Sequence, residues 1–123
     1  MARLTYQVVD GKASWDGRTL AEWLPDVVAR IVDGFAPLQV ILFGSVARGD
    51  DDPDSDIDLL VVFDKIRGRR HDAAVSVLRA LRGLPVPVDI FPTDPVWIDR
   101  SGNLPGTLRV ALREGKVVYE REA

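Results

Sequence analysis

The sequence predicts an α/β (α+β) fold, in which a mixed sheet is flanked by helices and preceded by an N-terminal β-hairpin. Short apolar runs typical of buried strands alternate with segments whose apolar residues recur at helical spacing. The chain has 123 residues, of which 46% are hydrophobic, and this suits one domain with a packed core. We therefore expect a single domain over residues 1–123, with residues 1–18 as a hairpin extension.

The N-terminal segment contains two β-prone runs, residues 4–9 and 12–15, joined by Asp10-Gly11. Asp-Gly between two such runs is typical of a type I′ turn, whose two central residues both have positive φ. This pattern predicts the hairpin.

The first helix has two possible starts. Thr19 and Glu22 have the spacing of a capping box, and apolar residues follow at helical intervals. Pro25 lies inside this pattern, and proline suits the first helical position but removes a hydrogen bond from a helix interior. We favour a short turn followed by a helix that begins at Pro25, over a longer helix that is kinked there. Asp33-Gly34 is expected to end the helix.

Three core strands are expected, at Val40–Phe43, Ile57–Phe63 and Val86–Phe91. Pro87 places the third strand at a sheet edge or at its own beginning, because proline cannot donate to a ladder. The segment 44–55 contains glycine, proline and several acids, so at least its second half should be a loop.

The remaining elements follow from the same patterns. A helix after residue 70 should place four apolar residues on one face, and Asp94 followed by Pro95 should open a short helical turn. A last helix should end at Gly115, and Val117–Tyr119 should form a terminal strand. The residues expected on the apolar helix faces are Ala74, Val77, Leu78 and Leu81, and then Leu104, Leu108, Ala111 and Leu112.

Composition excludes several classes of protein. The formal charge of −3 argues against bulk binding to a nucleic-acid backbone, and the absence of cysteine rules out disulfides and thiolate metal sites. No apolar run approaches the ~20 residues that span a bilayer, and no signal-like segment begins the chain. We therefore expect a cytoplasmic protein without membrane contact, in which hard cations with oxygen ligands remain available.

Asp56 and Asp58 stand at the start of an otherwise apolar strand. Alternation places both carboxylates on one face, about 6 to 7 Å apart along the strand, and this span suits one or two metal ions. Taken alone, the pair also fits a purely structural interpretation, in which Asp56 caps a turn and Asp58 forms an ion pair with an arginine. Asp89 lies in a second apolar run, so it could complete a three-carboxylate metal site; its alternative is again a salt bridge.

Gly44-Ser45 follows a buried strand and opens a turn, as a phosphate-binding loop would. The loop is not a Walker A motif, because Asp50 occupies the lysine position. Arg48 could bind a triphosphate or pair with the acidic loop, and the sequence leaves both roles open. His71 and the arginines at 67, 69 and 70 are expected in solvent, and Trp97 in the core or at a partner surface.

Gly44-Ser45, ten residues, and then Asp56-Ile57-Asp58 is similar to the signature of the DNA polymerase β-like nucleotidyltransferase superfamily. The flanking residues of both motifs resemble the minimal nucleotidyltransferases of that superfamily. The resemblance implies that Asp56 and Asp58 bind two Mg²⁺ ions. It also implies that Asp89 binds the catalytic ion and orients or deprotonates the acceptor hydroxyl, and that Gly44 and Ser45 hold the phosphates of ATP.

Proteins of this minimal kind often act as antitoxins beside an all-helical HEPN toxin, and several transfer AMP to a tyrosine of that toxin. The resemblance therefore implies an enzyme that adenylylates a HEPN partner, as a type VII-like antitoxin, in a homo- or hetero-oligomer. Two alternatives remain: an antitoxin that neutralises its toxin by binding alone, and a nucleotidyltransferase acting on a small molecule. The N-terminal hairpin is not part of the motif, and the sequence assigns it no role.

Overall fold

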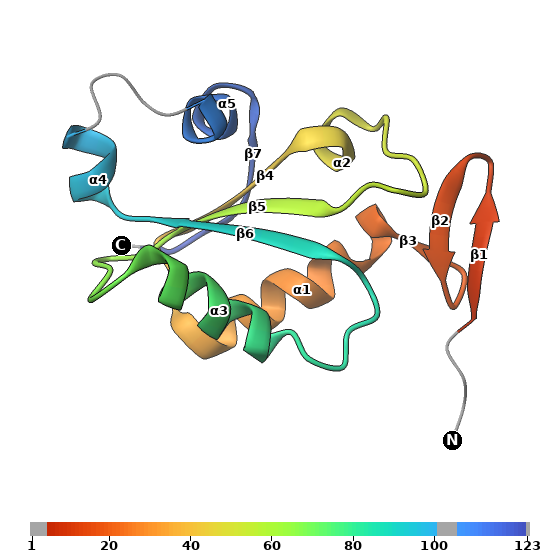
Figure 1. The fold of residues 1–123 in the computed structure, drawn as a ribbon, viewed down its shortest axis with the longest axis horizontal. Coiled ribbons are helices and arrows are strands. Elements are labelled where there is room, and N and C mark those ends of the chain that lie inside the picture. Colours follow the sequence, from red (N-terminus) through yellow and green to blue (C-terminus); the bar gives the residue numbers. More distant parts are fainter. Residues whose placement is uncertain (1–4, 101–105, 123) are drawn as a thin grey trace.

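The computed structural model describes residues 5–100 and 106–122, so Leu4 and Leu104 of the predicted elements lie outside them. A four-stranded mixed sheet has helices on both faces, and a three-stranded meander lies beside one end of the sheet (Figure 1). The elements in chain order are β1 (Tyr6–Val9), β2 (Lys12–Trp15), β3 (Arg18–Thr19), α1 (Leu20–Phe35), β4 (Gln39–Phe43), α2 (Gly44–Arg48), β5 (Ile57–Val62), α3 (Arg70–Ala80), β6 (Val88–Thr93), α4 (Pro95–Arg100), α5 (Gly106–Glu114) and β7 (Lys116–Glu120).

The predicted hairpin is present as β1 and β2, and a third, short strand pairs with it. Asp10 and Gly11 have φ values of 52° and 77°, as a type I′ turn requires. A second turn at Asp16-Gly17 has nearly the same φ values, 53° and 76°, and it adds the short strand β3. This second turn was not predicted, because β3 contains only two residues and so has no detectable alternation.

The favoured start of the first helix was wrong. Helix α1 begins at Leu20, with Thr19 as its N-cap and both hydrogen bonds of the capping box to Glu22, and Pro25 lies inside it. Burial of side chains before the proline, including Trp23, together with the cap offsets the hydrogen bond that Pro25 cannot make. The helix also continues one residue past Gly34, to Phe35, and ends where Ala36 adopts a left-handed conformation and donates its N–H to the Val32 carbonyl.

The core sheet has the strand order β6-β5-β4-β7, with β5 and β6 parallel and the other pairs antiparallel. Strand β6 is at a sheet edge, one of the two positions that Pro87 predicted, but it begins at Val88, two residues later than expected. It extends to Thr93 and so includes Pro92, which an edge strand tolerates because one of its sides needs no hydrogen-bond donors. None of the helices in the described residues is long and apolar enough to cross a bilayer.

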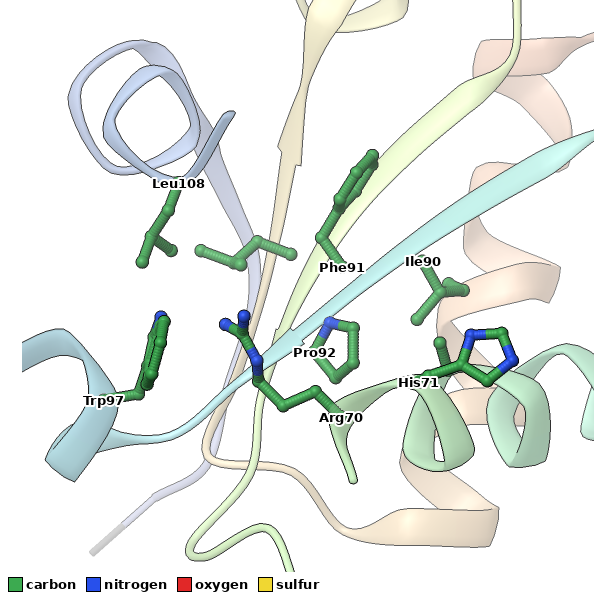
Figure 2. A pocket seen from close by; sticks show the side chains of 9 residues that line it. Arg70, His71, Ile90, Phe91, Pro92, Trp97 and Leu108 are labelled. Atoms are coloured by element: carbon green, nitrogen blue, oxygen red, sulfur yellow. The ribbon is translucent and has the colours of Figure 1, made fainter. Parts of the chain in front are cut away.

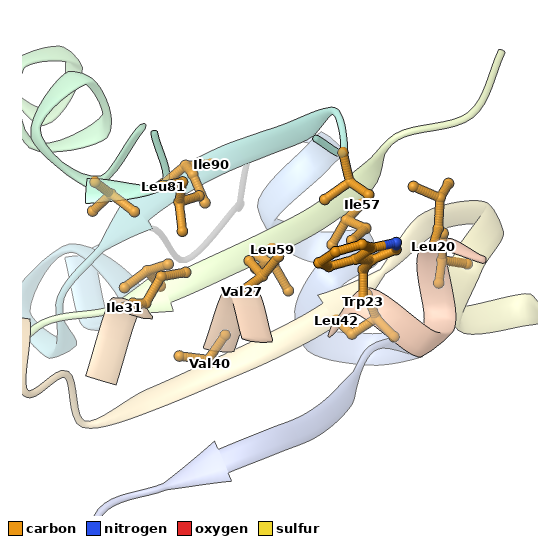
Figure 3. Close-up of a cluster of buried hydrophobic side chains, with 14 of the residues drawn as sticks. Leu20, Trp23, Val27, Ile31, Val40, Leu42, Ile57, Leu59, Leu81 and Ile90 are labelled. Carbon is orange, nitrogen blue, oxygen red and sulfur yellow. The ribbon is translucent and has the colours of Figure 1, made fainter. Parts of the chain in front are cut away.

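The two faces of the sheet are covered differently. Helices α1 and α3 pack on one face, around Val27, Ile31 and Leu59, which are fully buried (Figure 3). Leu78 of α3 is exposed rather than packed here, so its predicted position was wrong. Helix α5 packs on the other face, through Leu108 and a few other apolar residues. The acids of the predicted site belong to this second, less covered face.

Candidate metal and nucleotide site

The strand register brings the three predicted acids together. Asp58 of β5 lies beside Asp89 of the parallel strand β6 and opposite Phe43 of β4. Asp56, two residues before Asp58, points to the same side of the chain. One carboxylate oxygen from each acid lies within 4.8 Å of the other two, so the three side chains could hold one metal ion. Asp56 and Asp58 are half-buried and Asp89 is exposed.

The electrostatics of this cluster favour the binding of a cation. Burial raises the pKa of Asp58 to about 6, the negative charges of Asp89 and Asp56 add to the shift, and Arg48 opposes it. Burial also raises the pKa of Asp56, and the neighbouring Asp89 carboxylate acts in the same direction. The four ion pairs found in residues 5–100 and 106–122 all join other side chains. The salt-bridge interpretation of these acids is therefore not realised in the described part of the chain.

Gly44 has a steric role that the sequence did not indicate. Its φ is +77°, and a Cβ at this position would overlap Oδ2 of Asp58 and lie 3.2 Å from its Cγ. Only glycine therefore allows the Asp58 carboxylate to lie against the start of α2. The half-buried Ser45 follows in the first turn of the same helix, so the predicted phosphate-binding residues directly adjoin the acids.

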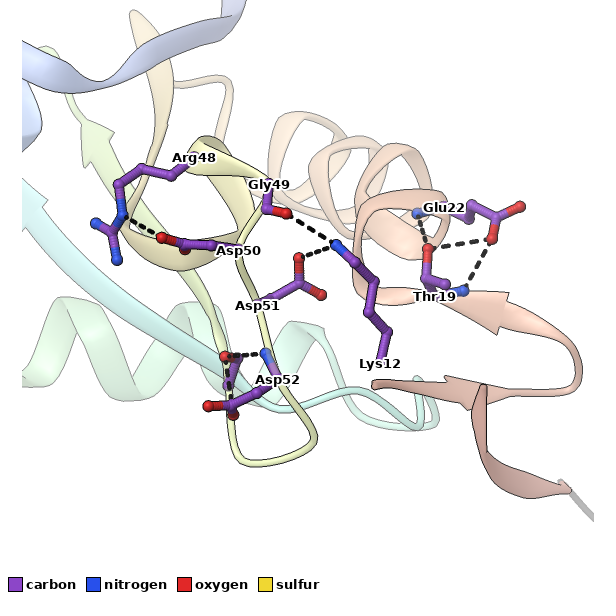
Figure 4. A network of polar contacts seen from close by, with 9 residues as sticks. Lys12, Thr19, Glu22, Arg48, Gly49, Asp50, Asp51 and Asp52 are labelled. Atoms are coloured by element: carbon purple, nitrogen blue, oxygen red, sulfur yellow. Dashed lines mark hydrogen bonds and ion pairs between the residues drawn. The ribbon is translucent and has the colours of Figure 1, made fainter. Parts of the chain in front are cut away.

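Arg48 makes a contact that agrees with one of its two predicted roles. Its Nε donates to Oδ2 of Asp50 at 3.2 Å, and both side chains are more than half exposed (Figure 4). An exposed pair of this kind contributes little to stability, so it can be exchanged for another partner at small cost. The guanidinium is therefore close to the acids and remains available to an anion.

A pocket of about 320 Å³ lies along the edge strand β6, and no pattern in the sequence predicts it (Figure 2). Trp97 of α4, Phe91 of β6 and Leu108 of α5 line it together with Arg70, which opens α3. The Arg70 guanidinium carbon lies 3.9 Å from the centroid of the Trp97 ring, in a cation–π contact. No spacing along the chain links these residues, so only the fold could reveal the pocket. His71 also lines it and is exposed, as predicted.

Comparisons with known proteins agree with the class that this fold and site define, which is an α+β nucleotidyltransferase with clustered carboxylates. The family described as "Nucleotidyltransferase domain" matches residues 22–117. A putative nucleotidyltransferase from Sulfolobus solfataricus is 30% identical, with a TM-score of 0.59, over 83% of this chain and 81% of that chain. The chain therefore belongs to the nucleotidyltransferase domain family.

A second solved structure shares the fold. It is a chain from a mutant of the toxin–antitoxin pair MntA–HpeT, with 22% identity and a TM-score of 0.56, over 80% of this chain and 73% of that one. Among curated protein sequences there is no match.

Proposed function

We propose that this protein is a Mg²⁺-dependent nucleotidyltransferase that transfers AMP from ATP to a hydroxyl group of a protein acceptor. The observation that carries the proposal is the meeting of Asp56, Asp58 and Asp89, whose oxygens lie within 4.8 Å of one another. Carboxylate oxygens are the ligands that Mg²⁺ takes together with substrate phosphates. The raised pKa of Asp58, to about 6, supports a site built for a cation.

Each residue then has a defined task. Asp56, Asp58 and Asp89 would hold Mg²⁺, which supplies charge neutralisation at the phosphates. Backbone N–H groups at Gly44 and Ser45, with the Ser45 hydroxyl, would bind the β- and γ-phosphates. The acceptor oxygen forms a bond to the α-phosphorus while the bond to the bridging oxygen breaks and pyrophosphate leaves. The exposed Asp89 carboxylate would take the proton of the acceptor hydroxyl.

Arg48 would leave Asp50 and bind the triphosphate. This exchange replaces one exposed, solvent-screened ion pair by another, so it costs little. Arg48 also supplies a positive charge near Asp58 before the nucleotide arrives, and this charge partly opposes the rise in the pKa of Asp58 that burial and the neighbouring acids cause.

The acceptor that we propose is a tyrosine of a HEPN toxin, with this protein as its antitoxin. The resemblance of the two motifs to minimal nucleotidyltransferases supports this choice. The pocket beside β6 supports an aromatic group near the acids, because Phe91 is two residues beyond Asp89 on the same face. A planar ring from the acceptor or from the nucleotide would suit its apolar wall.

The test is incubation with ATP labelled at the α-phosphate, Mg²⁺ and the protein encoded next to this chain. Label on the partner, lost in Asp56→Ala/Asp58→Ala and retained in Asp33→Asn, is the expected result. Asp33 is a matched control because it is an exposed aspartate on α1, which packs on the other face of the sheet. Full neutralisation of the toxin by the double variant would support binding alone instead. Label on small alcohols but not on the partner would support a small-molecule acceptor.

A further inference from the structure

Lys12 joins the N-terminal meander to the loop that leads into the acids. Its Nζ donates to Oδ1 of Asp51 at 2.8 Å and to the carbonyl oxygen of Gly49 at 3.1 Å (Figure 4). The Asp51 side chain is only 3% exposed, so its charge depends on this one ion pair among the described residues. The contact spans 39 positions of the sequence. Asp51 lies within residues 22–117, which the family match covers, whereas Lys12 precedes them.

The residues next to Lys12 in the meander pack against the body of the protein. Ala13 and Ser14 of the same strand are buried, and Trp15 packs against the main core cluster. The indole N–H of Trp23 in α1 donates to the Trp15 carbonyl at 3.0 Å. The residues of β2 that follow Lys12 are therefore anchored to the body of the protein, so the lysine at the start of the strand can hold a neighbouring segment in place.

The segment that Lys12 holds is the one that places Asp56. Residues 49–56 connect α2 to β5, and Asp56 is the only one of the three acids that lies in this loop rather than in a strand. Asp58 and Asp89 are positioned by the hydrogen bonds of the sheet. Asp56 is held on one side by Ile57, whose N–H donates to the Pro87 carbonyl at 3.0 Å. On its other side it is held only through the loop, so the position of its carboxylate also depends on the conformation of the loop.

We propose that Lys12 is a positioning residue, which fixes the loop 49–56 and thereby sets the Asp56 carboxylate for metal binding. The meander then helps to position a metal ligand of the site, through the contact of Lys12 with the loop. This inference rests on the proposed function for its consequence in catalysis, but its effects on the loop and on metal affinity are measured without any acceptor.

The experiment compares the wild type with Lys12→Met/Asp51→Asn, which removes the bridge without leaving a buried charge unpaired. Lys12→Arg is the rescue variant because it keeps the donor. Asp26→Asn is the matched control: it breaks the 2.9 Å ion pair with Arg18 that also ties the meander to the body, but it does not touch the loop. The measurements are Mn²⁺ affinity by calorimetry, amide hydrogen exchange of residues 49–56, and kcat and KM for nucleotidyl transfer.

We expect the double variant to weaken Mn²⁺ binding by about tenfold, as loss of residues that orient metal ligands typically does. Exchange in residues 49–56 should accelerate, and kcat should fall with little change in KM for ATP. The single variant Lys12→Arg should keep most of the wild-type Mn²⁺ affinity, and Asp26→Asn should keep all of it. Unchanged Mn²⁺ affinity or unchanged exchange in the double variant would overturn the inference.

The same data separate this inference from the proposed function. A wild type that binds no Mn²⁺, or that transfers no nucleotide, contradicts the proposed function. Hydrogen exchange in residues 49–56 still decides whether Lys12 holds the loop. A folded double variant with wild-type Mn²⁺ affinity contradicts the positioning role alone.

Discussion

Two groups of aspartates lie next to each other in this protein and have opposite surroundings. In the loop after α2, Asp50 pairs with Arg48, Asp51 pairs with Lys12, and Asp52 accepts hydrogen bonds from within the loop. In and before the strands, Asp56, Asp58 and Asp89 face one another, and no ion pair of the described residues includes them. The acids of the first group, which we call the loop acids, have ion-pair or hydrogen-bond partners within the protein. The acids of the second group, Asp56, Asp58 and Asp89, which we call the strand acids, have no ion-pair partner among the described residues.

This difference in hydrogen bonds and ion pairs distinguishes acids that stabilise the fold from acids that are suited to binding a ligand. A paired or hydrogen-bonded carboxylate lowers the free energy of the folded state modestly. Burial of carboxylates that lie close together raises it, and the raised pKa values of Asp56 and Asp58 reflect first this burial and then the neighbouring negative charges. Such a cost is typical of functional sites, where stability is exchanged for binding. Substitutions in the two groups should therefore have opposite effects.

The largest effect is expected for Asp58→Asn. Loss of the central carboxylate should lower kcat/KM for nucleotidyl transfer by about 10³-fold, or ~4 kcal/mol of transition-state stabilisation. The same variant should melt at a higher temperature than the metal-free wild type, because one of three repelling charges is gone. Steady-state kinetics and thermal melts check both effects. A variant that loses activity and stability together would contradict the comparison.

Gly44→Ala should disturb the strand acids through the backbone. A side chain at φ +77° is strained, and its Cβ would overlap the Asp58 carboxylate, so we expect a loss of ~2 kcal/mol in unfolding free energy. Denaturant unfolding measures this loss. Gly34→Ala is the control, since a Cβ there meets open space inside helix α1 and should stabilise by up to ~1 kcal/mol.

The pH dependence of stability should carry the signature of Asp58. Folded Asp58 holds its proton more tightly than the unfolded chain does, because its pKa is raised from 3.8 to about 6. Its contribution to stability is therefore complete below pH 3.8 and is lost as the pH rises through 6. Since the side chain is partly exposed, solvent screening limits the loss to ~1 kcal/mol.

Urea unfolding of the metal-free protein at several pH values between 4 and 7 measures this slope. Asp58→Asn should remove the Asp58 part of it. Saturating Mn²⁺ should reverse its sign, because the cation binds the deprotonated form. A slope that survives the substitution unchanged would assign the titration to another group.

The smallest effect is expected in the loop. Asp52→Ala removes an acceptor that takes the Asp54 N–H at 2.8 Å and the Ser55 hydroxyl at 3.3 Å. These bonds are exposed, so the free energy of unfolding should fall by only ~0.5–1 kcal/mol. Chemical denaturation monitored by circular dichroism is the measurement. A stabilised Asp52→Ala protein would remove the contrast between the two groups of acids.

Local signals in the sequence were sufficient for much of the fold. The Asp10-Gly11 turn and the three buried strands follow from short-range patterns of turn residues and apolar side chains. At Pro25 two local patterns conflict: the capping box predicts a helix that begins after Thr19, and the proline predicts one that begins at residue 25. The structure shows that the capping box and the buried face of α1 prevail. The second turn at Asp16-Gly17 was missed because a two-residue strand leaves no periodicity to detect.

The sequence by itself determined which carboxylates could form a site, because acids in apolar strands and Gly44-Ser45 at a fixed spacing are local facts of the chain. Only the tertiary structure decided that Asp89 lies beside Asp58, since strand order and register depend on the whole sheet. It also decided that Gly44 must lack a side chain because of Asp58, and that Lys12 reaches Asp51. These contacts join residues far apart in the chain, and no pattern within one segment encodes them.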